Sequence, residues 1–419
     1  MEQSRHYKVS KKKRRDSFMI FPVDVINYIL VGIMLGVGGT WVFLLKSMID
    51  HYTMTPRLDG FKSSKDDNPK VSIILPARNE QGYIEKCLDS LIEQDYTNYE
   101  IVAIDDSSED KTGEIIAKYA KQDSRVIYVK AKPKPDGWMG KNWACMEGYR
   151  KASGGLLLFT DADTTHKKNV ISLAVDHLLS LKLDALTVAP KMLCMEFWTR
   201  ITLPMISTFL HTRFSALRVN DPTKKTGYFF GSFFIIKKNV YDSVGAHEGV
   251  KQEIIEDGAL GKKVKESGHK MRMVAGENFI EAIWARDLLT LWHGLKRMMV
   301  PLYLQMGGIA IGIFFAVLFL LFMPFAFLAY SAILFNTSLS FQVLFAASLA
   351  ASGLIYAGAA IETKMMYLKL RYAILGPVGS FVIVLGFMSG LIHAKSNSAV
   401  SWRGRDYTMK DHAQKAINV

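Results

Sequence analysis

Four long and almost uncharged segments most constrain what this 419-residue chain can fold into. Phe18–Leu45, near the N-terminus, contains one charged residue, Asp24. Three more segments follow residue 300: Gly307–Phe335, Leu339–Ile361 and Tyr372–Ala394. At 1.5 Å per helical residue, each is long enough to span the ~30 Å hydrocarbon core of a bilayer. We therefore expect an integral cell membrane protein.

These segments divide the chain into six expected regions. They are a basic tail (1–17), a membrane segment (18–46), a linker (47–69), a globular domain (70–297), a C-terminal membrane region of about three helices (298–395) and a polar tail (396–419). The net charge of +13 fits a protein beside anionic headgroups. No recognition motif accompanies that charge, so nucleic acid is not an expected partner.

The globular domain alternates between short apolar runs and segments with helical periodicity. The expected strands are 71–75, 100–104, 126–129, 156–160 and 185–189, and the expected helices are 80–93, 109–119, 141–152 and 169–181. This alternation predicts an α/β fold with a mostly parallel sheet. Ligands of such sheets bind at the carboxyl ends of the strands, where this sequence places its polar clusters.

Paired carboxylates end two of these strands. Asp105 and Asp106 follow one strand, and buried carboxylates at that position need donors such as the imide and ribose hydroxyls of a nucleoside. Helix capping by the following Ser108 or Asp110 is the alternative, but it does not explain two adjacent aspartates. Asp161 and Asp163 follow another strand with one residue between them. Such a pair can share Mg²⁺ or Mn²⁺, which in turn holds a diphosphate.

The first strand ends in Pro76, Arg78 and Glu80. This polar turn can wrap a base and ribose, or it can simply cap a helix. Lys141 follows a glycine at an expected helix start, where it can contact phosphate or remain a solvated surface lysine. Gly231 interrupts an aromatic run, which indicates either a strand bulge or a backbone passing close to a sugar.

Glu256 and Asp257 open an expected helix. The helix dipole alone can explain carboxylates in a first turn. The functional alternative is that Asp257 acts as a general base toward an attacking hydroxyl group. Two flanking stretches, Glu196–Arg218 and Arg286–Met299, have helical apolar spacing. We expect them to lie on the membrane surface or to pack into the core.

Four motifs in order carry a resemblance to family 2 of the glycosyltransferases, which have the GT-A fold. They are Ile74–Glu80, Asp105–Ser108, Asp161–Asp163 and Glu256–Asp257. Within the family, Asp136–Cys145 and Trp402–Tyr407 resemble the branch of the carotenoid (diaponeurosporenoate), hopanoid-associated and ceramide glucosyltransferases. Ceramide glucosyltransferase and the polysaccharide synthases carry a Gln-x-x-Arg-Trp motif after the base, and this sequence departs from them because Arg286–Trp292 contains no such motif. The departure argues against processive synthesis.

The resemblance implies an inverting transfer from a nucleotide-diphosphate sugar, with a UDP-sugar expected, to a lipid or membrane-associated acceptor. It implies that Asp105 or Asp106 binds the base, that Asp163 with Asp161 binds Mg²⁺ or Mn²⁺, and that Asp257, beside Glu256, is the catalytic base. The expected contacts to the donor, the phosphates or the acceptor are Pro76, Arg78, Glu80, Lys141, Gly231, Trp292, Lys296, Arg297 and Arg403.

Other interpretations remain open at this point. A polyprenyl-phosphate glycosyltransferase or a polysaccharide synthase is the alternative enzyme, and a membrane scaffold that kept the fold without catalysis is the alternative of another class. We expect the catalytic domain to face the cytosol, where nucleotide-sugars are made. The basic residues of the two tails fit this orientation only with extra turns in the membrane. One turn would be a re-entrant bend near Gly36–Gly39, and the other a reversal near Met323–Pro324.

Overall fold

The computed structural model describes residues 2–60, 68–395, 400–402 and 405–407. The chain forms two compact units. One contains residues 1–48, 200–209 and 311–385 and is made of long helices. The other contains residues 49–199, 210–310 and 386–419 and holds the main sheet. The candidate site lies within this second unit.

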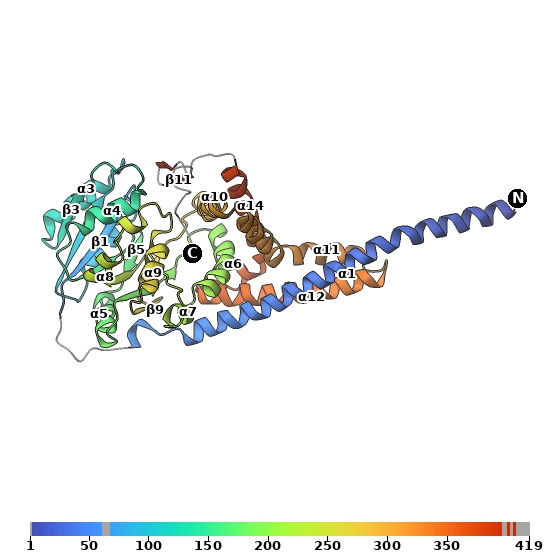
Figure 1. The fold of residues 1–419 in the computed structure, drawn as a ribbon, viewed down its shortest axis with the longest axis horizontal. Helices are drawn as coiled ribbons and strands as arrows, with labels where there is room; N and C mark the ends of the chain where they lie inside the picture. The colour runs from blue at the N-terminus through green and yellow to red at the C-terminus, as the bar shows by residue number, and fades with distance from the viewer. Residues whose placement is uncertain (1, 61–67, 396–399, 403–404, 408–419) are drawn as a thin grey trace. The chain divides into compact units, whose positions relative to one another are not determined.

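The main sheet has seven strands in the order β3-β2-β1-β4-β8-β6-β9 (Figure 1). Their bounds are β1 Val71–Ala77, β2 Tyr99–Asp105, β3 Val126–Lys130, β4 Leu156–Phe159, β6 Ala185–Ala189, β8 Phe234–Lys237 and β9 Met271–Ala275. Within this sheet β8 alone pairs antiparallel to its neighbours β4 and β6. The prediction of a mostly parallel sheet is therefore confirmed. Parallel pairing of β1, β2 and β4 puts their carboxyl ends at one edge.

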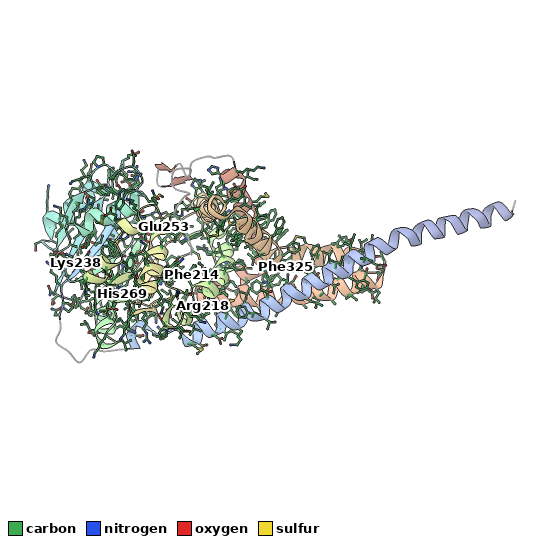
Figure 2. The ribbon with its side chains drawn as sticks, viewed as in Figure 1. Phe214, Arg218, Lys238, Glu253, His269 and Phe325 are labelled. Carbon is green, nitrogen blue, oxygen red and sulfur yellow. The ribbon has the colours of Figure 1, made fainter. Side chains whose placement is uncertain are left out.

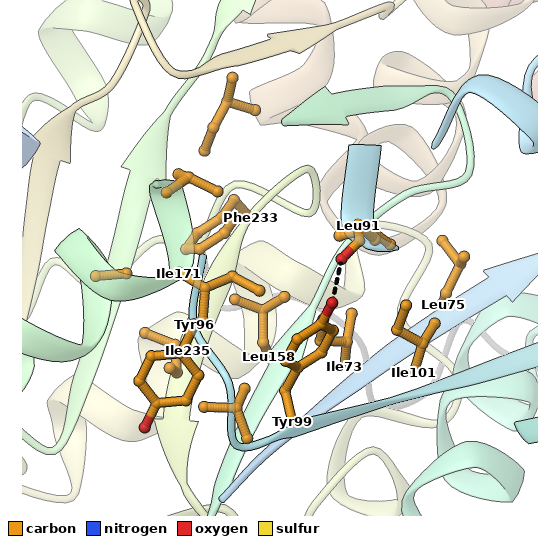
Figure 3. Packing of buried hydrophobic residues seen from close by; sticks show 14 of the residues in the cluster. Ile73, Leu75, Leu91, Tyr96, Tyr99, Ile101, Leu158, Ile171, Phe233 and Ile235 are labelled. Atoms are coloured by element: carbon orange, nitrogen blue, oxygen red, sulfur yellow. Dashed lines mark hydrogen bonds between the residues drawn. The ribbon is translucent and has the colours of Figure 1, made fainter. Parts of the chain in front are cut away.

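Helices cover both faces of the sheet because alternate residues along each strand point to opposite sides. Ile73 and Ile101 belong to the core cluster on one face, while Ile74 and Val102 belong to the cluster on the other. The first face is covered by α2 Ile84–Ile92, α3 Thr112–Gln122 and α5 Val170–Ser180, and the second by α4 Gly140–Tyr149, α7 Ala216–Asn220, α8 Lys238–Ser243 and α9 Glu256–Glu266. Figure 3 shows the first cluster, including the hydrogen bond that the Tyr99 hydroxyl donates to the Leu91 carbonyl.

A three-stranded sheet, in the order β5-β10-β7, extends the site-bearing unit. Its strands are β5 Thr164–His166, β7 Lys191–Met192 and β10 Ile280–Ala282. β5 follows the carboxylates after β4, and β10 leads into α10, Leu288–Leu321. A separate hairpin joins β11 Val400–Trp402 to β12 Arg405–Tyr407. The small sheet thus links the end of β4 to the segment that precedes α10.

The long helices include three that are long and apolar enough to cross a membrane: Val23–Met54 of α1, Leu339–Met365 (α12) and Gly376–Lys395 (α14). A bent pair, Met306–Leu321 and Met323–Ile333 (α11), becomes a fourth if it forms one span. The two helices of this pair are bent by 50° relative to each other. Two separate crossings would need the chain to reverse its direction near Met323, and a 50° bend is far from a reversal.

The N-terminal helix α1 runs without interruption from Glu2 to Met54. The expected re-entrant bend near Gly36–Gly39 is therefore wrong. A Cβ added at Gly32, Gly36 or Gly39 would meet no atom within 4 Å, so no close packing forces the chain to turn there. The same helix takes in the expected basic tail and the first part of the expected linker.

The stretch expected at 196–218 forms α6, Phe197–Arg213, followed by α7. Ile201, Leu203 and Met205 on α6 are buried, and so are polar neighbours such as Thr202. All residues from 201 to 208 are buried, although Phe197 and Leu210 near the helix ends are exposed. Burial on every side of this central part favours the core-packing alternative over a helix lying on a membrane surface. The start of α14 packs against α6, because a Cβ at Gly379 would come 2.0 Å from the Ile201 carbonyl oxygen.

A buried carboxylate on β2 ties the centre of the sheet together. Glu100 accepts hydrogen bonds from Ser72 on β1 (2.6 Å) and from the backbone of Ser153 before β4 (2.7 Å). It also pairs with Lys70 at 2.7 Å. Burial alone raises the pKa of Glu100, but Lys70 and the serine donors outweigh it and hold the pKa at about 2. Glu100 therefore stays ionised and bonded over the physiological range.

We expect Glu100→Ala to lower the free energy of unfolding by about 3 kcal/mol, because its buried donors lose their common acceptor. Glu114→Ala, an exposed carboxylate on α3, is the control and should change the free energy of unfolding by less than ~0.5 kcal/mol. Denaturant unfolding of the purified protein in detergent measures both variants. Equal effects would contradict a structural role for the Glu100 network.

Candidate active site

The loops after β1 and β2 lock together at the carboxyl edge of the sheet. The Asn79 amide nitrogen donates to Ser108 Oγ at 3.1 Å, and the Asn79 side chain accepts from the Glu109 amide at 2.9 Å. Arg78 Nη1 donates to the Asp106 carbonyl at 2.8 Å. Asn79 and Ser107 both have left-handed backbone conformations, with φ of 54° and 56°. Non-glycine residues hold such conformations when surrounding bonds impose them, and here the two loops do so.

The two carboxylates after β2 differ in how the protein uses them. Asp105 Oδ1 accepts the Ser108 amide at 2.9 Å, and Oδ2 lies 3.4 Å from the Tyr128 hydroxyl. Asp106 is also buried, and its amide donates to the Ala77 carbonyl at 2.8 Å. Asp105 thus holds the turn, whereas the first amide of α3 is capped by Asp110, whose Oδ1 accepts the Thr112 amide at 2.9 Å. Both carboxylates lie at the edge where the loop of Arg78 is anchored.

An ion cluster forms where β4 ends and α9 begins. Lys141 Nζ, from the first turn of α4, lies 2.7 Å from Asp161 Oδ1 and 2.6 Å from Glu256 Oε1. Burial lowers the pKa of Lys141, but the charges of Asp161 and Glu256 outweigh it and hold the pKa above its ordinary value. Lys141 is thus a permanent cation between two carboxylates that are 95 positions apart in the sequence.

Gly231 lies at the centre of this cluster. A Cβ there would come 2.8 Å from Asp257 Oδ2, 3.0 Å from Lys141 Nζ and 3.3 Å from Asp161 Oδ2. Any side chain would therefore displace charged groups that hold one another in place. The expectation that Gly231 serves close backbone approach fits this position, although what approaches is three side chains of the protein.

Asp257 is the best-placed proton acceptor in the cluster. Its Oδ2 accepts the Gly231 amide at 2.8 Å, and its Oδ1 accepts the Gly258 amide at 2.7 Å. Burial, together with the neighbouring charge of Glu256, raises the pKa of Asp257 to about 7. A carboxylate tuned close to neutral pH is matched to general-base catalysis.

Arg286, in the segment between β10 and α10, binds the remaining carboxylates. Its Nη2 lies 3.2 Å from Asp163 Oδ2 and 2.5 Å from Glu80 Oε2, and its guanidinium carbon lies 4.1 Å from the centre of the Tyr83 ring. Burial and the charge of Asp161 raise the pKa of Asp163 to about 6, against the opposing effect of Arg286. Neither Arg286 nor Tyr83 was predicted as a site residue, since no local pattern links Arg286 to partners 123 or more positions away in the sequence.

The first part of α10 brings one of the four expected phosphate or acceptor contacts to the cluster. Arg297 interacts electrostatically with Glu256, Asp257 and Asp161, and burial lowers its pKa. Among the described residues, no hydrogen bond or ion pair joins Trp292 or Lys296, which are half-buried, to the cluster. Arg403 lies outside the described residues.

The helix that carries Arg297 is held by close packing on α14. A Cβ at Gly386 would come 2.7 Å from Leu295, and one at Gly390 would come 2.9 Å from Met299. Leu291, Leu295 and Met299 are buried, so the apolar face predicted for 286–299 packs inside the protein. The same helix turns non-helical at Met306, before the candidate span begins.

An aromatic wall adjoins Asp257. Phe214, which follows α6 and is labelled in Figure 2, stacks on Tyr228 with ring centres 4.5 Å apart. Tyr228 in turn meets Phe230 edge to face at 5.4 Å. Burial and the charge of Asp257 raise the pKa of Tyr228. This wall was not predicted as part of the site, although the aromatic run around Gly231 had marked the segment.

Comparison with known proteins identifies the domain that carries most of this site. Residues 72–245 match the family described as Glycosyl transferase family 2. The chain carries a family 2 glycosyltransferase domain. The match covers β1 to the end of α8 and therefore includes every strand-end carboxylate described above. The predicted resemblance to family 2 is confirmed, and three of its four motifs lie within the matched residues, whereas Glu256–Asp257 lies beyond them.

Two curated relatives show the range of similarity. The 4,4'-diaponeurosporenoate glycosyltransferase of Staphylococcus aureus is 25% identical over 222 residues, which are 52% of this chain and 57% of the relative. The probable glycosyltransferase YdaM of Bacillus subtilis is 29% identical over 133 residues, 31% of each chain. This chain thus spans between about a third and just over half of the length of these relatives.

Among solved structures, the mannosyltransferase PcManGT from Pyrobaculum calidifontis, in complex with GDP-Man and Mn²⁺, is similar with a TM-score of 0.51. The match has 16% sequence identity and covers 89% of this chain and 98% of that one. At this identity the likeness concerns the fold. The predicted GT-A fold with apolar helices at both ends is confirmed.

We expect Lys141→Met to lower the free energy of unfolding by about 2 kcal/mol, because Asp161 and the buried Glu256 lose their shared cation. The figure is discounted because Asp161 is one-third exposed. Lys118→Met removes an exposed lysine that pairs with Glu85 at 3.7 Å, and this control should have little effect. Thermal unfolding in detergent compares the two. A stable Lys141→Met variant would mean that Lys141 is not needed to neutralise the cluster.

Proposed function

We propose that this protein is a membrane-bound inverting glycosyltransferase. It transfers a sugar from a nucleotide-diphosphate sugar, with a UDP-sugar expected, to a lipid or membrane-associated acceptor. Residues 70–297 form the catalytic domain on the cytosolic side, and residues 18–46 and 298–395 form the membrane regions. The observation that carries the proposal is the convergence of Asp257, Lys141 and Asp161 around the backbone of Gly231.

The carboxyl edge of β1 and β2 supports a nucleoside site. The loop of Arg78 and the turn of Asp105 are bonded to each other, so they form a preorganised surface. Either Asp105 or Asp106 can accept hydrogen bonds from a base imide or from ribose hydroxyls. Pro76 and Glu80 border this surface at the end of β1.

Asp161 and Asp163 fit a hard divalent cation, Mg²⁺ or Mn²⁺, because their ligand atoms are carboxylate oxygens. Within the described residues, no group of three or more His, Cys, Asp or Glu side chains could hold a metal ion. Two carboxylates suffice if oxygens of the donor diphosphate complete the coordination. A cation bound there would stabilise the negative charge that develops on the leaving diphosphate.

The protein's own groups perform the remaining steps. Asp257 accepts the proton of the acceptor hydroxyl, whose oxygen attacks the anomeric carbon on the face opposite the departing nucleoside diphosphate. The Gly231 amide orients Asp257, and Glu256 and burial keep its pKa near neutrality. Lys141 and Arg297 supply positive charge beside the site of bond cleavage.

Two observations support a lipid or membrane-associated acceptor. Helices long enough to span a bilayer flank the catalytic domain on both sides in the sequence. One relative is named for 4,4'-diaponeurosporenoate, a carotenoid. The raised pKa of Asp257 favours an acceptor hydroxyl over a phosphate, because an anionic acceptor has no proton for a base to remove.

The direct test incubates membranes containing the protein with radiolabelled nucleotide-sugars, one at a time, and extracts the products into organic solvent. We expect label in the lipid fraction with one donor, and none after addition of EDTA or in Asp163→Ala. Asp59→Ala, an exposed carboxylate outside the site, should retain transfer. Wild-type activity in EDTA would overturn the metal assignment, and label found in polysaccharide alone would overturn the acceptor assignment.

The role of Asp257 predicts a pH dependence. A base with a raised pKa loses its ionised form as the pH falls through about 7, so kcat/KM should decline below that pH. Asp257→Asn should lower kcat by on the order of a hundredfold and abolish this acidic limb. Glu266→Gln, at the opposite end of α9, should keep both the rate and the profile. An unchanged profile in Asp257→Asn would indicate another base or a phosphate acceptor.

A further inference from the structure

Arg286 makes its contacts to two side chains that are themselves almost fully enclosed. The Asp163 side chain is 10% exposed and that of Glu80 is 5% exposed, whereas that of Arg286 is 26% exposed. Stacking on Tyr83 fixes the plane of the guanidinium group. Arg286 therefore reaches inward from the surface to neutralise two buried carboxylates.

The backbone that carries Arg286 is fixed, while its side chain is long. The Arg286 amide donates to Thr290 Oγ1 at 2.9 Å, and the Thr290 amide donates to Asp287 Oδ1 at 2.7 Å. These bonds cap α10 and hold the segment in place. A change of partner by Arg286 thus requires side-chain rotation alone, without unfolding of the helix start.

Two cations compete for Asp163 Oδ2. Arg286 is bonded to this oxygen, and the proposed divalent cation would bind the same carboxylate at about 2.1 Å. A guanidinium and a divalent ion within a few ångströms of each other repel strongly at a partly buried site. Occupancy of Asp163 by one cation therefore weakens the hold of the other.

We propose that Arg286 is an exchangeable counter-ion of Asp163, so that the divalent cation binds well only together with a nucleoside diphosphate. The proposal rests on the function proposed above. The metal alone must displace Arg286 from Asp163, so that Arg286 loses one of its two carboxylate partners and keeps only the ion pair with Glu80. When the diphosphate binds together with the metal, Arg286 keeps its ion pair with Glu80 and gains phosphate oxygens as new hydrogen-bond acceptors. The nucleotide thereby strengthens metal binding, and the coupling is reciprocal.

This exchange gives the site an order of events. The diphosphate carries the divalent cation in, and after transfer the loss of the diphosphate returns Arg286 to Asp163. Arg286 is thus a positioning residue for the metal rather than a group that acts on the sugar. Glu80 holds the Arg286 guanidinium near the site in both arrangements. This role gives a reason for the burial of the Glu80 carboxylate, which a helix-capping role alone does not require.

The test measures Mn²⁺ binding to the purified full chain by the loss of the free-ion electron paramagnetic resonance signal. Titrations are done without nucleotide and, separately, with UDP and with GDP. In the wild type we expect weak binding of Mn²⁺ alone and about tenfold or more tighter binding with one nucleotide. In Arg286→Met we expect Mn²⁺ alone to bind about tenfold more tightly, with most of the nucleotide effect lost.

Two control variants complete the experiment. Arg57→Met removes an arginine that pairs with Glu277 at 2.9 Å outside the site, and it should match the wild type. Asp163→Asn should weaken Mn²⁺ binding with and without nucleotide, which assigns the measured ion to this carboxylate. Unchanged or weaker binding of Mn²⁺ alone in Arg286→Met overturns the proposal, as does an equal gain in Arg57→Met.

The two proposals fail in distinguishable ways. Absence of sugar transfer from every donor would refute the proposed function but leave the Mn²⁺ titrations free to support the exchange. Transfer with unchanged Mn²⁺ affinity in Arg286→Met would support the function and refute the exchange. Arg286→Lys keeps the charge without the stacked plane, so it should keep the weak binding of Mn²⁺ alone.

Discussion

The balance of charge at the carboxyl edge of the sheet is the constraint on which the site depends. Burying a carboxylate without a partner costs several kcal/mol, yet the ends of β1, β2, β4 and the start of α9 each bring acidic side chains to this region. The protein meets that cost with cations from elsewhere in the chain. Lys141 comes from α4, Arg286 from the segment before α10, and Arg297 from α10 itself. The fold must therefore assemble several elements before the acidic cluster becomes stable.

Glycine residues allow these elements to approach one another at positions where a side chain would hold them apart. The backbone at Gly231 lies among the charged groups, and Gly227 approaches α9 so closely that a Cβ would come 2.1 Å from the Gly261 carbonyl oxygen. Each contact sets the distance between α9 and the segment opposite it. The position of Asp257 thus follows from backbone contacts on both of its sides, beyond its own hydrogen bonds.

Local patterns in the sequence were sufficient to predict the parallel sheet and the acidic residues at its carboxyl edge. Apolar runs such as Leu156–Phe159 end in aspartates, and parallel pairing brings these ends together whatever the details of packing. Lys141 and Arg297 were predicted as site residues, but Arg286 was not, because Arg286 and Asp163 are brought together by folding and no spacing rule relates them. Helix α1 was misjudged for a different reason. The glycines at 36, 38 and 39 lower helix propensity, but an apolar segment that must satisfy its own backbone groups remains helical.

The interruption at Met306 has a mechanical consequence. A continuous helix behaves as a stiff rod, so any tilt of its apolar turns would move Arg297 as well. At Met306 the backbone leaves the helical conformation, with φ of −141° and ψ of 62°, and the ladder of hydrogen bonds is broken there. The turns of α10 that carry Arg297 pack closely against Gly386 and Gly390 of α14. The break therefore leaves the turns that carry Arg297 with a hydrogen-bond ladder of their own, separate from that of the apolar turns after Met306.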